Sequence, residues 1–332
     1  MTRILGIETS CDETAAAIVV DGRTVESSVV SSQIDLHVPY GGVVPEIAGR
    51  AHVQRLNPVV REALREAGLD HRGAGVDLVA CTIGPGLIGA LLVGVSGAKA
   101  LAASWGVPFV GVNHLEAHLY SPFLAEPDLT LPLVTLLVSG GHTLLVLVES
   151  PTSYRVLGGT IDDAAGEAYD KVARFLGLGY PGGPAIDRLA PSGDPTAIAF
   201  PRPMRNDGYA FSFSGLKTSV VNYVRKNPTV RTEDVAASFQ AAVVDVLVHK
   251  ARAAADEFGA VGICLGGGVA ANSALRAEIA RVCALDGRRA LLPERAMCTD
   301  NAAMVAAAAW WRLPVDGPTP LDCGAYPGLR LR

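Results

Sequence analysis

The sequence predicts an α/β protein with two related lobes, and three observations lead to this prediction. Runs typical of β-strands alternate with alanine-rich runs typical of helices. Two hairpin-like segments repeat the same order of strand, polar loop and strand. A glycine-rich loop then joins a further apolar strand to a helix. With 332 residues, the chain is long enough for two such lobes, each with its own hydrophobic core.

The spacing of apolar side chains predicts the individual elements in chain order. Strands are expected at residues 3–8, 15–20, 77–82, 108–112, 132–138, 143–148, 261–265 and 289–292. Helices are expected at residues 45–67, 87–105, 113–123, 163–176, 232–258, 270–284 and 299–312. We place the first lobe at residues 1–112 and the second at 113–310, with the C-terminal helix region 311–332 packed back on the first lobe.

The two hairpins are the reason for relating the lobes to each other. They span Ile4–Val20 and Leu131–Val148, and both loops contain small or polar residues. The glycine-rich loop Leu265–Val269 follows an apolar strand and precedes a helix, which is a suitable site for phosphate or ribose. A flexible turn is the simpler interpretation of one glycine triplet. Three loops in this order favour the superfold of actin, sugar kinases and heat-shock ATPases (ASKHA), with a nucleotide cleft between the lobes.

Composition limits the class of protein. The chain is 49% hydrophobic and 18% charged, which is typical of a globular protein. No uninterrupted run of large apolar side chains has the length of a membrane helix, and no secretion signal precedes the first strand, so we expect a cytoplasmic protein. The six cysteines form no CxxC pair, which fits a reducing compartment. A net charge of −5 does not indicate a nucleic-acid binder and does not exclude one.

His114 and His118 form the first candidate site. They stand four residues apart after the apolar strand 107–112, so on a helix both imidazoles share one face. Such a pair is by itself more often found on a surface helix, but the junction of strand and helix is where sites form in open α/β sheets. Asp300, at the start of an alanine-rich helix, is the best third ligand, although an N-cap role would also explain it. Two histidines and one carboxylate would suit iron or zinc.

Two more polar segments could contact a ligand. The loop 138–143 contains two glycines, which would allow the backbone to approach a substrate closely. Asp163, Glu167 and Asp170 recur at helical spacing beside the glycine-rich turn 180–184. Carboxylates in this position commonly hold ribose hydroxyls, whereas a solvated acidic face is the simpler interpretation.

Three other positions carry weaker signals. Segment 211–218 places Lys217 among hydroxyl groups, which fits either a phosphate contact or the entry of a helix. Cys11 has no identifiable partner base, so a small buried filler is favoured over a nucleophile. Glu116 lies two residues after His114 and therefore points away from the ligand face, which argues against the HExxH arrangement of metallopeptidases.

Nine segments together resemble one protein family, the bacterial tRNA threonylcarbamoyltransferases of the TsaD/Gcp type, which are related to the Kae-type proteins. They are GIETSCDETAAAIV (6–19), HVPYGGVVPEIAGRAHVQ (37–54), GPGLIGALLVG (84–94), NHLEAHLYSP (113–122), VSGGHT (138–143), DDAAGEAYDKVARFLGLGYPGGPAID (162–187), FSFSGLKT (211–218), GGGVAANSALR (266–276) and CTDNAAM (298–304). These matches cover nearly the whole chain. The resemblance implies the two-lobed ASKHA fold.

The resemblance also implies a reaction. The threonylcarbamoyl group would pass from threonylcarbamoyl-AMP to N6 of adenosine-37 in tRNAs that read codons beginning with adenine, with release of AMP. One divalent metal ion per subunit is implied, iron (Fe²⁺) in the first place and zinc (Zn²⁺) as the alternative. An adenine nucleotide, either threonylcarbamoyl-AMP or ATP/ADP, would occupy the cleft. The implied partners are the tRNA, TsaB and TsaE proteins, and a Sua5/YrdC-type enzyme that supplies the donor.

Site residues follow from the matching motifs. His114, His118 and Asp300 would hold the metal ion. The acyl-adenylate and its nucleoside part would contact two groups of residues: Val138, Ser139, Gly140, Gly141 and His142, and Asp170, Gly183, Asp187 and Asn272. The archaeal relatives have a tyrosine near the metal in the first of these loops, where this chain has Leu137, so no tyrosine ligand is expected.

The reaction needs positioning and charge stabilisation more than covalent catalysis, because the donor is already activated. Asp12 is a candidate general base by its place in the first hairpin loop. Three other function classes stay open on the residues alone: a small-molecule kinase on the same fold, a metallopeptidase and a non-enzymatic scaffold. A kinase or a scaffold would tolerate loss of the two histidines.

Overall fold

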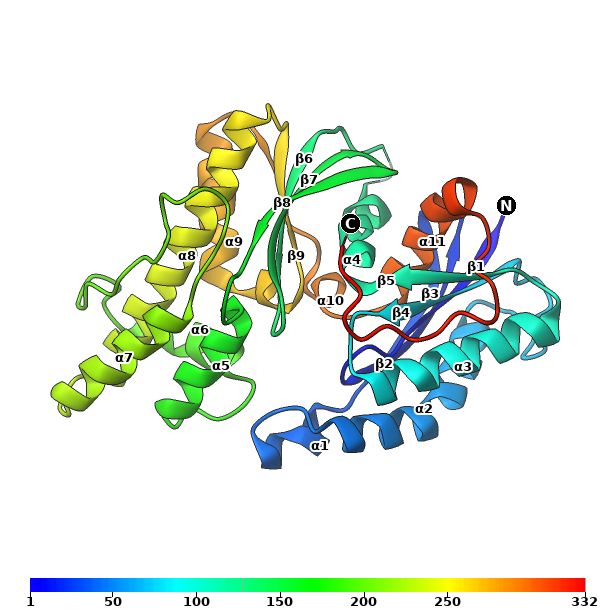
Figure 1. The fold of residues 1–332 in the computed structure, drawn as a ribbon, viewed down its shortest axis with the longest axis horizontal. Helices are drawn as coiled ribbons and strands as arrows, with labels where there is room; N and C mark the ends of the chain where they lie inside the picture. Colours follow the sequence, from blue (N-terminus) through cyan, green and yellow to red (C-terminus); the bar gives the residue numbers. More distant parts are fainter. Residues whose placement is uncertain (127, 332) are drawn as a thin grey trace. The chain divides into compact units, whose positions relative to one another are not determined.

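The computed structural model describes residues 1–126 and 128–331. Packing divides the chain into two compact units. The first unit combines Met1–Leu129 with Thr299–Arg332, and the second is Thr130–Cys298. Each unit has one five-stranded sheet (Figure 1).

The sheet of the first unit has the strand order β3-β2-β1-β4-β5. Its strands are β1 (Arg3–Glu8), β2 (Glu13–Val20), β3 (Thr24–Ser32), β4 (Leu78–Gly84) and β5 (Phe109–Asn113). The first three are antiparallel, and β4 and β5 run parallel to β1. β1 and β2 are buried almost throughout, which explains why they read as continuous apolar runs.

Helices cover both faces of this sheet. The helices of the unit are α1 (Ile34–His37), α2 (Pro45–Glu66), α3 (Ile88–Trp105), α4 (His114–Ala125) and α11 (Ala302–Asp316), with a short 3₁₀ turn at Val38–Tyr40. α2 and α3 lie on one face, and α4 and α11 lie on the other (Figure 1). Successive strand residues point to opposite faces. Thus Leu5 and Ile7 join the cluster under α2 and α3, while Gly6 faces Ala302 and Ala306 of α11.

One glycine in β1 permits the close approach of α11. A Cβ atom at Gly6 would clash with the backbone carbonyl of Ala302 and would press on Ala306. The segment after α11 then runs along the edge of the sheet. Thr319 N donates to Phe109 O at 2.8 Å, and Tyr326 N donates to Ile83 O at 2.7 Å. This places α11, and Asp300 just before it, firmly within the first unit.

Helix α3 has the length and composition of a membrane-spanning helix. Its mean hydropathy is 1.4, and 33% of its residues are buried inside the protein. The helix packs against α2 and β4. Much of its sequence is glycine, alanine and serine, which is why a search for large apolar side chains does not single it out.

The second unit repeats the topology of the first. Its strand order is β10-β9-β6-β7-β8, so each strand has a counterpart in the first sheet. The strands are β6 (Leu133–Val138), β7 (Thr143–Ser150), β8 (Ser153–Gly159), β9 (Gly262–Gly266) and β10 (Arg289–Leu291). β6, β7 and β8 are antiparallel, and β9 and β10 continue the sheet in parallel. The repeat of the hairpin pattern therefore corresponds to a repeat of the whole sheet.

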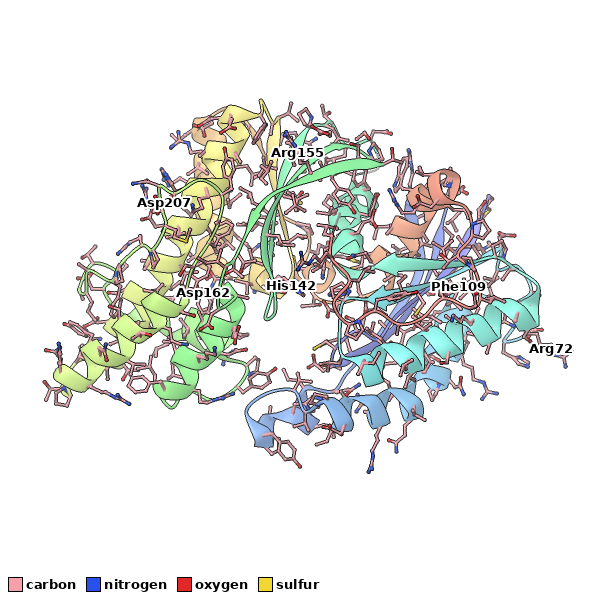
Figure 2. The ribbon with its side chains drawn as sticks, viewed as in Figure 1. Arg72, Phe109, His142, Arg155, Asp162 and Asp207 are labelled. Carbon is pink, nitrogen blue, oxygen red and sulfur yellow. The ribbon has the colours of Figure 1, made fainter. Side chains whose placement is uncertain are left out.

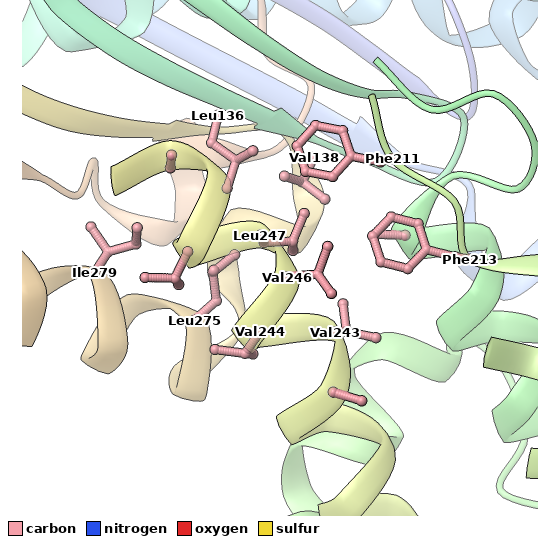
Figure 3. Packing of buried hydrophobic residues seen from close by; sticks show 14 of the residues in the cluster. Leu136, Val138, Phe211, Phe213, Val243, Val244, Val246, Leu247, Leu275 and Ile279 are labelled. Carbon is pink, nitrogen blue, oxygen red and sulfur yellow. The ribbon is translucent and has the colours of Figure 1, made fainter. Parts of the chain in front are cut away.

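Helices of different length pack with the sheet of the second unit, the longest being α8. They are α5 (Ala165–Phe175), α6 (Gly182–Leu189), α7 (Ser214–Lys226), α8 (Thr232–Glu257), α9 (Ser273–Leu285) and α10 (Arg295–Cys298), with 3₁₀ turns at Ala190–Ser192 and Gly268–Ala271. Figure 3 shows Val243 and Leu247 of α8 in one cluster with three other side chains. These are Leu136 of β6, Leu275 of α9 and Phe213, which directly precedes α7. All five side chains are essentially inaccessible to solvent.

The observed division of the chain differs from the expected one at two segments, α4 and residues 299–310. From the sequence we placed the boundary after residue 112, whereas α4 packs with the first unit. The reason is its contact with α11 and β5, which brings residues 113–125 back to the first sheet. Residues 299–310 join the first unit together with the C-terminal region, because α11 is one continuous helix.

Candidate functional site

The end of β5 positions the two histidines of the first unit. Asn113 closes the strand and caps α4, since its side-chain oxygen accepts hydrogen bonds from the N–H groups of Leu115 and Glu116. The helix therefore begins at His114, and one turn later His118 lies on the same face. Their ring centroids are 4.9 Å apart.

Asp300 completes a group of three possible metal donors with His114 and His118. Their ligand atoms all lie within 4.8 Å of one another. Oδ1 of Asp300 is 3.2 Å from Nε2 of His118 and 3.5 Å from Nε2 of His114. Both histidines are buried and the aspartate is partly buried. Two imidazole nitrogens and one carboxylate oxygen that converge in this way fit a divalent transition metal with open coordination positions.

The charges around His114 favour a cation at this place. Burial alone would lower the pKa of His114, but Asp300 and Glu8 outweigh it and raise the pKa to about 9. In the absence of a metal ion, a proton is therefore bound at neutral pH. A metal ion would replace that proton and would balance the negative charges of Asp300 and Glu8 in the same way.

Glu8, at the end of β1, is a residue that the sequence did not reveal. Its side chain is fully buried, and its Oε2 lies 3.0 Å from Nδ1 of His114. Burial by itself would raise its pKa, but the charge and hydrogen bond of His114 hold the pKa of Glu8 below its usual range. The sequence gave no signal that Glu8 contacts His114, because a glutamate at the end of an apolar strand looks like the first residue of a polar loop.

Two acidic residues stand near this group in the first hairpin loop. Glu13 opens β2, and burial together with the charges of Asp300 and Asp12 raises its pKa to about 9. Glu13 is therefore protonated at neutral pH in the metal-free protein. The sequence singled out Asp12 as the candidate base and missed Glu13, because Glu13 stands between polar neighbours just before the predicted strand 15–20 and gives no sign of burial.

Cys11 is only partly buried, not a fully buried filler, and Glu116 points away from the ligand atoms, as expected. Burial raises the pKa of the Cys11 thiol well above its usual value, so it stays protonated and is a poor nucleophile. The Oε1 atom of Glu116 lies 3.3 Å from Nε of Arg312 on α11. This ion pair holds the carboxylate away from the donor atoms of the two histidines.

The second unit contains a pocket of about 520 Å³. Five of the nine predicted substrate residues line it: Gly140, Asp170, Gly183, Asp187 and Asn272. Other lining residues are Gly166, Tyr169, Pro181, Pro184, Arg188, Gly268, Val269, Ala271 and Arg295. A pocket of this volume can hold a nucleotide.

Local hydrogen bonds fix the polar side chains of this pocket. Asp170 accepts a hydrogen bond from Gly182 N at 2.7 Å, and Asp187 accepts one from the Ser273 hydroxyl at 2.7 Å. Asn272 caps α9 through Leu275 N and donates to Gln240 at 2.7 Å. Burial raises the pKa of Asp170. These contacts hold the side chains rigid beside the pocket before any ligand binds.

The other four predicted residues are not in the pocket lining: Val138 ends β6, and Ser139, Gly141 and His142 belong to the turn between β6 and β7. Ser139 N donates to His142 O at 2.8 Å, and His142 N donates to the Ser139 hydroxyl at 3.1 Å, so the turn is closed on itself. His142 and Asp162 lie at the same end of the second unit (Figure 2). The space next to the α-carbon of Gly141 is open.

The acidic face proposed for α5 divides into two parts. Asp163 forms ion pairs with Lys171 and Lys217, with N–O distances of 2.9 and 2.8 Å, and Glu167 also pairs with Lys171 at 2.7 Å. Of the three carboxylates, Asp170 is the one that lines the pocket. Lys217 lies in the first turn of α7, so segment 211–218 is the entry of a helix whose lysine already has an acidic partner.

Two arginines of the pocket, Arg188 and Arg295, were not predicted. Both are exposed, and neither forms an ion pair with a residue that the structure describes. Arg188 follows Asp187 directly on α6, and Arg295 opens the short helix α10. Arginine in surface helices is common, so no pattern in the sequence separates these two from the others.

Comparison with known proteins gives a consistent result for the whole chain. A family model described as "tRNA N6-adenosine threonylcarbamoyltransferase" matches residues 24–307. A protein of Moorella thermoacetica with this description is 54% identical over 335 residues, which cover 99% of this chain and 97% of that protein. One from Thermotoga neapolitana is 51% identical and covers 99% of this chain and 100% of that protein.

Solved structures of low sequence identity share the fold. The structure of full-length HypF in the phosphate- and nucleotide-bound form aligns with a TM-score of 0.65 at 14% identity, over 96% of this chain and 56% of that one. Component A of (R)-2-hydroxyglutaryl-CoA dehydratase from Acidaminococcus fermentans aligns with a TM-score of 0.56 at 15% identity, over 95% of this chain and 100% of that one. These similarities and the repeated sheets confirm the predicted ASKHA fold.

Proposed function

Because the chain belongs to the tRNA N6-adenosine threonylcarbamoyltransferase family, and is therefore a tRNA-modifying transferase, we propose the following reaction for it. The threonylcarbamoyl group moves from threonylcarbamoyl-AMP to N6 of adenosine-37 in tRNAs that read codons beginning with adenine. A bond forms between N6 and the carbamoyl carbon, the bond from that carbon to the phosphate oxygen breaks, and AMP leaves with its electron pair. N6 loses one proton.

The convergence of His114, His118 and Asp300 is the observation that carries this proposal. A kinase on the same fold would need a carboxylate base but no pair of histidines. A metallopeptidase would need a free glutamate beside the metal, and Glu116 is paired with Arg312. A divalent ion held by these three residues, Fe²⁺ or Zn²⁺, would supply Lewis-acid stabilisation of the negative charge on the carbonyl oxygen.

The pocket of the second unit suits the nucleotide part of the donor. Asp170 and Asp187 can accept hydrogen bonds from ribose hydroxyls or an amino group, and Gly183 leaves room for a ring. Arg188 and Arg295 can neutralise the phosphate. The turn from Val138 to His142 would contact the acyl-adenylate through its open glycines.

Proton transfer has two candidates in the first hairpin loop. Asp12 is the candidate that sequence position suggests. Glu13 is protonated at neutral pH, with a pKa of about 9, so it could donate a hydrogen bond to the donor and exchange a proton with N6 or with the departing phosphate. Because the acceptor base lies in an anticodon loop, it can turn out of its stack without melting a duplex.

The net charge of −5 is unusual for a protein that must hold a tRNA. We propose that TsaB and TsaE proteins contribute part of the tRNA-binding surface and that a Sua5/YrdC-type enzyme supplies the donor. All of these would act in the cytoplasm. The charge supports the need for partners, since binding to phosphates normally needs clustered lysine and arginine.

A reconstituted transfer assay tests the proposal. The protein, its TsaB and TsaE partners, synthetic threonylcarbamoyl-AMP and unmodified tRNA are incubated, and the tRNA nucleosides are measured by mass spectrometry. We expect threonylcarbamoyladenosine with the wild type and at least a hundredfold less with His114→Ala, because a lost charge-stabilising group typically costs about 10²–10³ in rate. Equal amounts of product with the wild type and His114→Ala would exclude a role of the metal in the reaction. No product with the wild type or the variant would make a kinase function the alternative to test.

A further inference from the structure

Glu8 holds a position that no part of the proposed mechanism uses. It is the last residue of β1, its side chain has no solvent exposure, and it is the only residue of that strand with an ionisable group in the core. Its carboxylate contacts three hydrogen-bonding groups. Oε1 accepts from Ser10 N, and Oε2 accepts from the Thr82 hydroxyl at 2.6 Å and faces Nδ1 of His114 at 3.0 Å.

These contacts decide which nitrogen of His114 carries a proton. An ionised carboxylate can only accept hydrogen bonds, so Nδ1 of His114 must donate to it. The Ser10 hydroxyl is also 3.2 Å from Nδ1, but a hydroxyl can donate or accept and cannot enforce either state. When His114 acts as a neutral ligand, its proton is on Nδ1 and its lone pair is on Nε2, the atom that points toward Asp300.

The neighbouring histidine has no such support. Nδ1 of His118 is buried, and no described residue offers it a hydrogen bond. Its Nε2 atom still faces Oδ1 of Asp300 at 3.2 Å. The two imidazoles are therefore unequal, although they stand four residues apart on one helix face. Nδ1 of His114 faces a buried carboxylate, whereas Nδ1 of His118 has no hydrogen-bond partner among the described residues.

We propose that Glu8 is a positioning residue that fixes the ring orientation and tautomer of His114, so that Nε2 is presented to the metal ion. This inference rests on the proposed function only through the metal site at His114, His118 and Asp300. Carboxylates that accept from a metal-bound histidine are known to raise its strength as a ligand, and their loss lowers metal affinity by about 10–100-fold.

Glu8→Gln tests the role with almost no change in shape. A glutamine has one acceptor oxygen and one NH₂ group, while Ser10 N–H on one side and Thr82 and His114 on the other all donate. With NH₂ toward Ser10, two donors face each other; with NH₂ toward His114, the amide can donate to Nδ1 only if Nδ1 has lost its proton. If NH₂ faces His114, the tautomer with the proton on Nε2 is favoured, and that tautomer cannot bind the metal ion through Nε2.

The first measurement uses the full-length wild-type protein loaded with Zn²⁺ and labelled with ¹⁵N-histidine. We expect both histidines to bind through Nε2. The Nδ1–H proton of His114 should resonate far downfield and exchange slowly, because it is bonded to a buried carboxylate, whereas that of His118 should not. In Glu8→Gln, the downfield signal should disappear and the affinity for Zn²⁺, measured by chelator competition, should fall about 10–100-fold.

Glu116→Gln is the matched control, because it neutralises another buried carboxylate next to the same histidines that pairs with Arg312 instead. It should change neither the His114 signal nor the Zn²⁺ affinity. If wild-type His114 binds Zn²⁺ but shows no Nδ1–H bonded to a carboxylate, this inference is wrong and the metal site stands. If neither histidine binds Zn²⁺ in the wild type, the inference and the metal assignment are both overturned. The wild-type spectrum decides these points even if Glu8→Gln does not fold.

Discussion

At the residue scale, the first hairpin loop is held by a buried histidine from α2. His52 has no solvent exposure; its Nε2 donates to the carbonyl of Cys11 at 2.9 Å, and its Nδ1 lies 2.8 Å from the Thr14 hydroxyl. Burial lowers the pKa of His52. His52 is thus neutral in the folded protein and fixes the backbone just before Asp12 and Glu13.

We expect His52 to make the folded state less stable in acid. The unfolded histidine has a pKa near 6.5 and the folded one a lower pKa, so below pH 6.5 the unfolded state binds a proton that the folded state does not. The contribution of His52 to the free energy of unfolding is fully present above pH 6.5, and it is lost as the pH falls toward the pKa of His52 in the folded state. Between pH 7.5 and 5.5, the free energy of unfolding in urea should fall by up to about 1.4 kcal/mol per pH unit more in the wild type than in His52→Gln. The same slope in both proteins would contradict this assignment.

The two arginines of the pocket allow a prediction about the phosphate. Arg188→Gln and Arg295→Gln should each weaken binding of AMP about tenfold or more, because a hydrogen bond to a charged group contributes about 1.5–3 kcal/mol. Binding of adenosine, which has no phosphate, should be unchanged. Arg281→Gln is the control, since Arg281 pairs with Glu278 on α9 and does not line the pocket. Isothermal titration calorimetry measures all three, and an equal loss of AMP and adenosine binding would argue against a phosphate contact.

At the element scale, contact between β1 and α11 sets the position of Asp300. The contact is close because Gly6 has no side chain on the face that α11 covers. Asp300 and Asn301 precede the helix, and Asn301 caps it by accepting from Met304 N at 3.0 Å. The N-cap role that the sequence left open for Asp300 therefore belongs to its neighbour, which leaves Asp300 to face the histidines.

Gly6→Ala should displace α11 and disturb the metal donors. The new methyl group would meet the backbone of Ala302, which cannot move like a flexible side chain, so we expect a loss of about 1–3 kcal/mol in stability. Affinity for Zn²⁺ should fall as Asp300 moves. Gly89→Ala on the exposed side of α3, where a Cβ meets open space, should be neutral or slightly stabilising. Chemical denaturation and chelator competition give the two readouts, and an unchanged Gly6→Ala protein would show that α11 is free to adjust.

Most elements could be predicted from the sequence, and those that could not have identifiable physical causes. β3 and β8 were missed because they are edge strands with much exposed surface, so polar residues interrupt their apolar pattern. For two helices the cause is different: α6 begins inside the glycine-rich segment 180–184, and α7 begins among hydroxyl residues, so both starts look like loops. The buried strands are apolar runs and the long helices α3 and α8 are alanine-rich runs, and these elements were predicted within a few residues.

At the scale of the whole molecule, the two units carry different chemistry. The first holds the group of metal donors, and the second holds the pocket of about 520 Å³. Each unit has its own sheet and its own hydrophobic cluster. A ligand that binds only the folded state stabilises it by about 2.7 kcal/mol at a concentration of one hundred times its Kd, so either site can be followed by thermal unfolding.

We expect the two sites to be separable by mutation. Zn²⁺ and AMP should each raise the Tm of the wild type by several degrees, since about 1 kcal/mol corresponds to roughly 2–4 °C for a chain of this size or somewhat smaller. His114→Ala should abolish the shift caused by Zn²⁺ and keep the shift caused by AMP. Arg188→Gln should reduce the AMP shift and keep the Zn²⁺ shift. Differential scanning fluorimetry suffices, and loss of both shifts in either variant would show that the two ligands depend on each other.

The sequence by itself determined the order of the elements, the repeat of the hairpins, the family and the pairing of His114 with His118. These depend on residues within a few positions of one another or on motifs that can be read along the chain. The sequence also named Asp300 as the third metal ligand, and the structure places it beside His118, 182 positions away. Tertiary structure alone decided that Glu8 supports His114, that α4 belongs to the first unit and that Arg188 and Arg295 share a pocket. The physical reason is that helix and strand periodicity describe only neighbours along one element. Contacts between distant segments depend on how all the buried faces pack at once, and the pKa values of Glu13 and His114 are set by those contacts.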